Sequence, residues 1–142
     1  MEEDRTGEGS VKEQERLPNE RPSITHRFRI GKLKCYLTVG LYPDGRPGEL
    51  FLVANKQGSL TRGLMHCLAV MVSLALQHGV PLAEVVDKLK LVKFDPAGLT
   101  GNKDIPMADS VADYIGKWLE KRFLDCSESS ERRNRERETD SL

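Results

Sequence analysis

The stretch LTVGLYPDGRPGELFL, Leu37 to Leu52, contains the chain reversal around which the fold is predicted. Its centre, PDGRPG, is rich in proline and glycine, which favour tight turns. The flanking segments CYLTVGLY and ELFLVA contain β-branched and aromatic residues that favour extended backbone. Two strands joined by such a connection form an antiparallel hairpin. Arg46 lies in this turn, either as a solvated turn residue or as a contact for a ligand or partner.

A further strand region precedes the hairpin. In HRFRI, Phe28 and Ile30 alternate with two arginines, and Gly31 then interrupts the run. Alternation with a period of two residues is typical of a strand with one buried face. The sequence therefore predicts sheet structure from Thr25 to Val39, before the turn of the hairpin.

Downstream, GSLTRGLMHCLAVMVSLALQHGVP predicts one long helix. Ser59 is a suitable N-cap, and Gly79 followed by Pro81 is a suitable end. The apolar residues cover more than one helical face, which favours burial on several sides. We therefore expect the helix from Leu60 to His78 to be largely buried, packed on the sheet and on another helix.

The C-terminal half of the domain predicts two shorter helices and a long connection. PLAEVVDKLK has one narrow apolar stripe, and ADSVADYIGKWLEKRFL has apolar residues at helical spacing, with Trp118 as an anchor. LVKFDPAGLTGNKDIP lies between them, and a connection this long is often functional. The predicted fold class is α+β, a small antiparallel β-sheet packed against the long buried helix and a C-terminal helix near Ser110 to Phe123.

The charge distribution divides the chain of 142 residues into three parts. Residues 1–24 contain seven acids and four bases, and residues 125–142 contain six acids and four arginines. Because both stretches have few apolar residues, we expect disordered tails whose removal leaves the melting temperature nearly unchanged. Without them, the 22 bases and 22 acids of the chain become 14 and 9 in the domain at 25–124, a net charge of +5. A mildly basic domain suits an anionic partner, although its bases are scattered.

No residue pattern for catalysis, a bound cofactor or a metal ion is found. The three cysteines, Cys35, Cys67 and Cys126, form no CxxC pair, and their odd number favours a reducing compartment. No signal peptide opens the chain, and the apolar segment from Leu64 to Leu76 is too short to span a bilayer. We therefore expect a cytoplasmic protein outside the membrane. Asp113 is interpreted, with its neighbouring acids, as a surface or capping residue.

The order of three segments carries a family resemblance. YLTVGLYPDGRPGELFL, GSLTRGLM and KFDPAGLTGNKDIPMADSVADYIGKWL together resemble the C-terminal, TSCPD-type region of vitamin B12-dependent (class II) ribonucleotide reductases. The resemblance covers about residues 25–123. It implies a family whose full-length members use adenosylcobalamin to reduce ribonucleotides to deoxyribonucleotides. The TSCPD signature itself is not present, because the corresponding GNKDIPMADS has no cysteine.

The resemblance leaves two functions open. One is an accessory or detached domain that docks on a separately encoded reductase catalytic subunit; the other is a stand-alone regulatory module that binds a nucleotide or a protein. The radical cysteine and cobalamin contacts of the family lie in a barrel that these segments do not match, so we expect this chain alone to bind no cofactor. The sequence does not decide whether the protein forms a homodimer through the edge of its sheet. The candidate docking or ligand surface consists of Arg46, Thr100, Asn102, Lys103 and Asp104.

Overall fold

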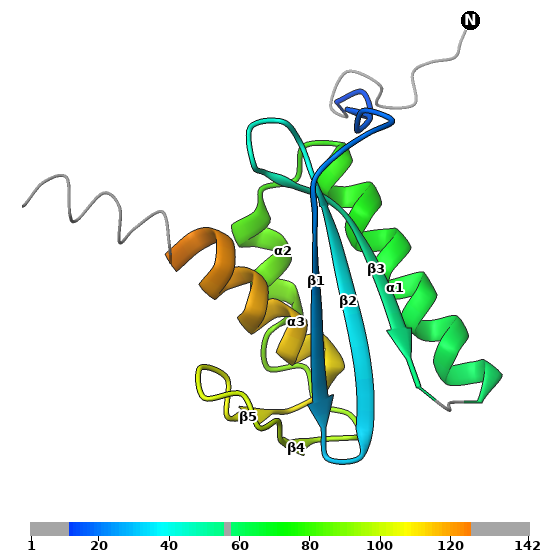
Figure 1. Cartoon of the computed structure of the whole chain (residues 1–142), viewed down its shortest axis with the longest axis vertical. Helices are drawn as coiled ribbons and strands as arrows, with labels where there is room; N and C mark the ends of the chain where they lie inside the picture. The colour runs from blue at the N-terminus through cyan, green and yellow to red at the C-terminus, as the bar shows by residue number, and fades with distance from the viewer. Residues whose placement is uncertain (1–11, 56–57, 126–142) are drawn as a thin grey trace, which may run out of the picture.

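A computed structural model describes residues 12–55 and 58–125 of the chain (Figure 1). The elements are, in chain order, β1 (Ser23–Ile30), β2 (Leu33–Leu41), β3 (Pro47–Ala54), α1 (Ser59–Gln77), α2 (Leu82–Leu89), β4 (Gly98–Leu99), β5 (Met107–Ala108), α3 (Val111–Leu119) and the π-helical extension η3 (Glu120–Asp125). The outer parts of the predicted tails, residues 1–11 and 126–142, lie outside the described residues.

The sheet is an antiparallel meander in the order β1-β2-β3. Its alternating pattern places one set of side chains, including Phe28, Cys35, Leu37 and Leu52, on the buried face. The predicted hairpin is present, and Gly45 takes a positive φ of 91° in its turn. The predicted α+β fold class is thus confirmed.

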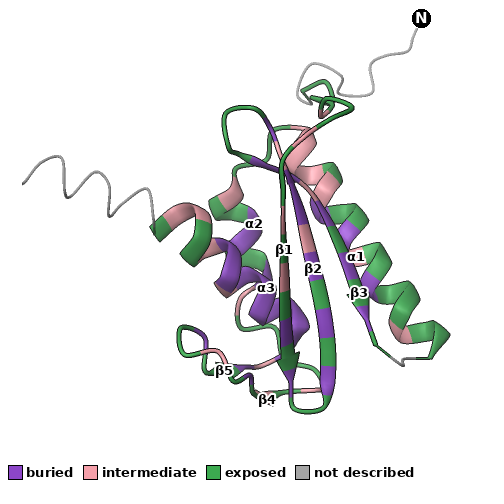
Figure 2. Ribbon diagram, viewed as in Figure 1, coloured by how far each residue is buried: buried purple, intermediate pink, exposed green. Residues whose placement is uncertain are grey.

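Helix α1 packs along the edge strand β3 (Figure 1). Only Met65, Ala69 and Val72 of the helix are buried, and its outer face is exposed (Figure 2). The expectation of a largely buried helix was therefore wrong, because the helix covers one strand with one face and meets α2 only slightly. The N-cap is Gly58, where we predicted Ser59, and no side chain caps this helix.

By length and composition alone, α1 could cross a membrane. Its hydrogen bonds to β3 show instead that it is part of the domain. Ser73 Oγ accepts a hydrogen bond from the Leu50 N–H at 2.8 Å, and Gln77 Nε2 donates to the Gly48 carbonyl at 3.0 Å. A helix of a soluble domain passes the same test of length and apolar composition.

Helix α3 is the most completely buried helix among the described residues (Figure 2). Tyr114, Ile115 and Leu119 are almost fully buried, and α2 packs beside α3, with Leu89 next to Gly116. The Ser110 side chain caps α3 by accepting a hydrogen bond from the Asp113 N–H at 3.0 Å. These contacts fix the start of α3 against the long connection that precedes it.

The segment before the sheet contacts the domain, in contrast to the tail predicted for residues 1–24. The Glu15 N–H donates to the Gln77 carbonyl at 2.8 Å, and the Tyr42 hydroxyl donates to the Glu15 carbonyl. Arg21 pairs with Glu49 at 2.6 Å. Ser23 and Ile24 already belong to β1. The ordered domain therefore begins earlier than the sequence pattern indicated.

Candidate functional site

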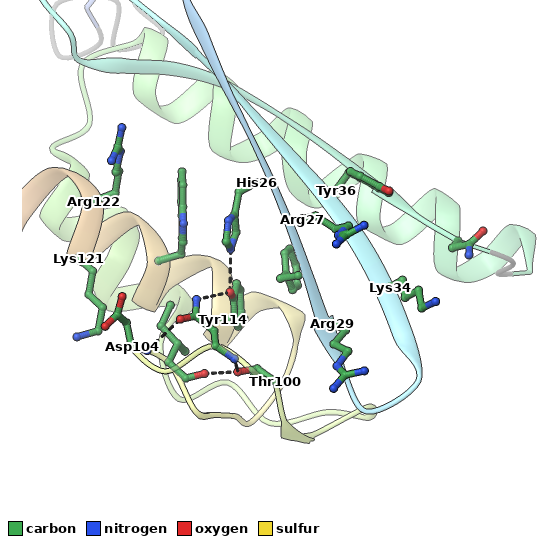
Figure 3. Close-up of a pocket in the computed structure, with 16 residues that line it drawn as sticks. His26, Arg27, Arg29, Lys34, Tyr36, Thr100, Asp104, Tyr114, Lys121 and Arg122 are labelled. Atoms are coloured by element: carbon green, nitrogen blue, oxygen red, sulfur yellow. Dashed lines mark hydrogen bonds between the residues drawn. The ribbon is translucent and has the colours of Figure 1, made fainter.

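A large open groove of about 990 Å³ runs along β1, and we call it the β1 groove (Figure 3). Side chains from both faces of β1, from the 100–105 loop, from α3 and from η3 line it. The lining residues are His26, Arg27, Phe28, Arg29, Lys34, Tyr36, Asn55, Thr100, Gly101, Asn102, Asp104, Ile105, Tyr114, Trp118, Lys121 and Arg122. Its volume is in the range of small-molecule binding sites.

The charged lining of the β1 groove is mostly cationic. Arg27, Arg29 and Lys34 lie on the solvent face of β1 and β2, and η3 contributes Lys121 and Arg122 from the other side (Figure 3). Asp104 is the one carboxylate among the lining residues. The groove therefore favours an anionic ligand.

The inner wall of the groove is an aromatic stack. The ring centroids of Phe28 and Tyr114 are 4.1 Å apart, and those of His26 and Trp118 are 5.1 Å apart, with nearly parallel planes. These rings join β1 to α3, and Phe28, Tyr114 and Trp118 belong to the hydrophobic core. The inner wall is thus rigid, because its members are packed against each other.

Two side chains from distant parts of the chain, His26 and Asn102, contact the Tyr114 hydroxyl. Its oxygen lies 2.8 Å from His26 Nε2 and accepts a hydrogen bond from Asn102 Nδ2 at 2.9 Å. Burial lowers the pKa of His26, which favours the neutral ring. In the neutral ring, Nε2 accepts from the Tyr114 hydroxyl when the proton is on Nδ1, and donates to it in the other tautomer. Burial also raises the pKa of Tyr114, so the hydroxyl keeps its proton at neutral pH.

The 100–105 loop is held by its own polar side chains. Thr100 Oγ1 donates to the Ile105 carbonyl and accepts from the Asn102 N–H at 3.1 Å. Asn102 Oδ1 accepts from the Asp104 N–H at 2.9 Å. Of the residues predicted for the candidate surface, Thr100, Asn102 and Asp104 line the groove, whereas Lys103 is exposed beside it. Thr100 is buried and Asn102 is bound to Tyr114, so both support the loop structurally.

Arg46, the remaining predicted residue, lies in the β2–β3 turn and does not line the groove. In Figure 1 this turn is at the opposite end of the sheet from the β1–β2 turn and from β4 and β5. Its guanidinium contacts Asp44 Oδ2 at 2.6 Å and Glu15 Oε2 at 3.0 Å, and its central carbon lies 4.7 Å from the Tyr42 ring centroid. These contacts attach the segment before the sheet to the β2–β3 turn. The predicted set of five residues therefore does not form one surface.

Sequence reasoning missed most of the groove. The arginines of HRFRI were visible as the polar positions of a strand, and their repeat was the available signal. Nothing in the sequence indicated the contact between His26 and Tyr114, which are 88 residues apart. Their proximity results from the packing of α3 against β1.

The described residues contain no group of three or more His, Cys, Asp or Glu that could hold a metal ion. Cys35 is buried, and burial raises its pKa to about 11, so it stays a thiol at neutral pH. Cys67 is exposed on α1, away from the groove. A reactive cysteine needs a lowered pKa, and that of Cys35 is raised.

Comparison with known proteins places the chain in a family. Residues 10–123 match the TSCPD domain. The chain belongs to the TSCPD domain family. The resemblance seen in the sequence is thereby confirmed, although the cysteine-containing signature is not present in GNKDIPMADS. No solved structure matches this TSCPD domain.

Several relatives share a single name, vitamin B12-dependent ribonucleotide reductase. The protein from Rhodopirellula baltica is 49% identical over 116 residues, which are 82% of this chain and 11% of that protein. The protein from Streptantibioticus cattleyicolor is 46% identical over 109 residues, 77% of this chain and 18% of that protein. The protein from Agrobacterium fabrum is 41% identical over 114 residues, 80% of this chain and 9% of that protein. This TSCPD domain thus spans between about a tenth and a fifth of these relatives.

The names of the relatives imply a cobalamin, which the described residues of the TSCPD domain do not fit. His26 is the one histidine in the groove, and its Nε2 is already hydrogen-bonded to the Tyr114 hydroxyl. The remaining lining is cationic and aromatic. No part of the function proposed below therefore depends on cobalamin bound to this domain.

Proposed function

We propose that this TSCPD domain is an accessory or detached domain of an adenosylcobalamin-dependent ribonucleotide reductase. It would act with a separate catalytic chain and support the reduction of ribonucleotides to deoxyribonucleotides for DNA synthesis. The observation that carries the proposal is the 41–49% identity to a short part of proteins named as such reductases. This function also implies the cytoplasmic location predicted from the sequence.

The outer face of α1 is the best-suited docking surface. Leu60, Leu64, Met71 and Leu74 are exposed by 75%, 61%, 60% and 44%, and we call them the α1 stripe. Their separations of four, seven and three residues place them along one side of the helix. An exposed apolar stripe of this kind is typical of a protein–protein contact.

The comparisons favour a reductase chain as the occupant of the α1 stripe. The relatives carry the matched part within a chain about six to eleven times longer, so most of each reductase chain lies outside the matched part. A membrane is a poorer occupant, because Ser73 and Gln77 bind the opposite side of α1 to β3. A partner protein can therefore reach the α1 stripe while α1 stays packed on the sheet.

The proposal is tested with the full chain and a B12-dependent reductase catalytic chain from the same host that lacks this region. Co-purification and light scattering measure the complex, and deoxynucleotide formation measures its effect. We expect Leu64→Lys and Met71→Lys to reduce association at least about tenfold, because each buries a charge in an apolar contact. Met107→Lys is the matched control, since Met107 is a 52% exposed methionine outside the stripe.

Several results would contradict this function. One is that the domain does not associate with the catalytic chain. Another is that the stripe variants and the control variant lose the same amount of association. A third is that the domain does not change the rate of deoxynucleotide formation by the catalytic chain. Self-association that Met71→Lys disrupts would identify a second copy as the occupant of the stripe. Binding to lipid vesicles through the stripe would identify a membrane instead.

The second candidate is a stand-alone regulatory module without reductase activity. The β1 groove favours it, because a cationic groove can bind an anionic ligand without a catalytic partner. A complete reductase in the same host whose activity does not change on adding this domain would favour the module over the accessory domain.

A further inference from the structure

Four side chains on the solvent face of β1 and β2 form one patch in the β1 groove. Arg27, Arg29, Lys34 and Tyr36 are all exposed, and we call them the β1–β2 patch (Figure 3). The strand register places Arg27 opposite Tyr36 and Arg29 opposite Lys34. Directly opposite residues have Cβ atoms about 4.5–5.5 Å apart, so these side chains share one small area.

The pairing of Arg29 with Lys34 is unfavourable by itself. Like charges directly opposite each other in a sheet are destabilising. Within the described part of the chain, neither side chain makes an ion pair, and Arg27 also has none. An anion bound between them would relieve this repulsion. Three neighbouring cations without a protein carboxylate partner suit a ligand with several negative charges.

The 100–105 loop lies beside one of these cations, Arg29. A Cβ added at Gly101 would lie 3.5 Å from Arg29 Nε, which is an ordinary van der Waals contact, so the loop lies beside the guanidinium. The positive φ of 77° at Gly101 favours glycine there. The Gly31 N–H also donates to the Leu99 carbonyl at 3.1 Å, which ties the β1–β2 turn to the same loop. The patch is therefore presented on a braced part of the sheet.

We propose that the β1–β2 patch binds a nucleoside di- or triphosphate. Arg27, Arg29 and Lys34 contact the phosphates, since guanidinium groups bind phosphate oxygens in pairs and lysine binds them as a point charge. The exposed ring of Tyr36, opposite Arg27, stacks on the base. The ligand site goes beyond the docking role and does not depend on it, because α1 lies outside the β1 groove.

The overall charge of the chain favours a small ligand over a nucleic acid. Nucleic-acid-binding domains are commonly strongly basic, with a pI above about 9. The domain at residues 25–124 is only mildly basic, with 14 bases against 9 acids, and the β1–β2 patch itself contains three cations. A polyphosphate attached to one base matches a short cationic patch with a single exposed aromatic ring.

The test is isothermal titration calorimetry of the full chain at low ionic strength, with ATP, inorganic tripolyphosphate and a single-stranded oligothymidylate as probes. We expect ATP binding that the double variant Arg27→Gln/Arg29→Gln and the single variant Lys34→Gln each weaken, the former by at least about tenfold. Tyr36→Leu should weaken ATP binding more than tripolyphosphate binding, because only ATP carries a base. Arg62→Gln is the matched control, an exposed arginine on α1 outside the groove.

Circular dichroism and melting temperature establish whether each variant is folded. If the double variant is unfolded, Lys34→Gln still tests the patch. ATP binding that is absent, unchanged by the patch variants, or equally weakened by Arg62→Gln would overturn the proposal. Tighter binding of the oligothymidylate than of ATP would overturn it in favour of a nucleic acid. These readouts use no reductase chain, so they are independent of the docking test.

Discussion

At the scale of single residues, Asp113 differs most from its sequence interpretation. It was interpreted as a surface or capping residue, and the structure buries it completely. Its carboxylate accepts the N–H groups of Leu91 at 2.7 Å and Asp109 at 2.8 Å, and Lys117 lies 2.8 Å away. Burial opposes ionisation, but these hydrogen bonds and Lys117 outweigh it and lower the pKa of Asp113. One side chain thus holds both ends of the long connection.

We predict that Asp113→Ala destabilises the protein by about 2–4 kcal/mol, because two backbone N–H groups lose their acceptor. Chemical denaturation measures the change in the free energy of unfolding. Asp87→Ala on α2 is the control, since Asp87 is exposed, and should change stability by less than about 0.5 kcal/mol. Equal effects of the two substitutions would show that the Asp113 contacts are not stabilising.

The lowered pKa of His26 leads us to predict that the stability of the protein depends on pH. Burial lowers its pKa in the folded chain below the ordinary value of 6.5, so the unfolded chain binds the proton more readily. The stability that the neutral His26 ring adds to the folded chain is therefore present above about pH 6.5, and it is lost as the pH falls below this value. We expect the free energy of unfolding to decrease from about pH 7 to about pH 5.

Urea unfolding at several pH values checks this. His26→Gln should reduce the slope of stability against pH in that range. His66→Gln, which changes an exposed histidine on α1, should preserve the slope. A slope that is the same in wild type and His26→Gln would assign the pH dependence to other groups.

At the scale of elements, α1 is attached to the sheet by a polar contact as well as by apolar packing. Ser73 Oγ accepts from the Leu50 N–H at 2.8 Å and donates to the Ala69 carbonyl at 2.7 Å. Leu50 is buried on the edge strand β3, so its N–H has no access to water as a substitute. The contact also sets which face of α1 is turned outward.

We predict that Ser73→Ala destabilises the protein by about 1–3 kcal/mol, since the Leu50 N–H is left without an acceptor. Thermal and chemical unfolding measure the effect. Ser59→Ala is the matched control at the start of the same helix, where the Ser59 side chain is exposed and α1 has no side-chain cap. A loss of more than about 1 kcal/mol for Ser59→Ala would instead support the N-cap predicted from sequence.

At the scale of the whole molecule, the segment before the sheet joins α1 to the β2–β3 turn. Glu15 contacts Gln77, Tyr42 and Arg46 through its backbone and carboxylate. Two of these contacts are backbone or hydroxyl hydrogen bonds, which depend less on salt than exposed ion pairs do. The segment therefore belongs to the folded unit.

We predict that deleting residues 1–20 lowers the melting temperature by about 4–8 °C, the change expected for a loss of about 1 kcal/mol in a domain of this size. This replaces the expectation of a nearly unchanged melting temperature that followed from treating residues 1–24 as a tail. Calorimetry of the shortened and full chains measures it. Glu15→Gln, which alters only the exposed carboxylate, should have a smaller effect, and an unchanged melting temperature in the deletion would restore the tail interpretation.

The local patterns of the sequence determined which elements form. The turn residues of PDGRPG and the alternation of HRFRI predicted the antiparallel sheet, and helical spacing predicted α1, α2 and α3. The order of three segments also carried the resemblance to the TSCPD domain family. These signals were readable because turn propensity and apolar periodicity act between residues close in the chain.

Only the tertiary structure decided which faces are covered and which side chains meet. It joined His26 to Tyr114 across 88 residues, buried Asp113, exposed the outer face of α1, and separated Arg46 from the 100–105 loop. The physical reason is that burial depends on packing between elements distant in sequence, and three strands with α1 along one edge leave part of an apolar helix uncovered. The same strand register set Arg29 opposite Lys34 and so created the β1–β2 patch.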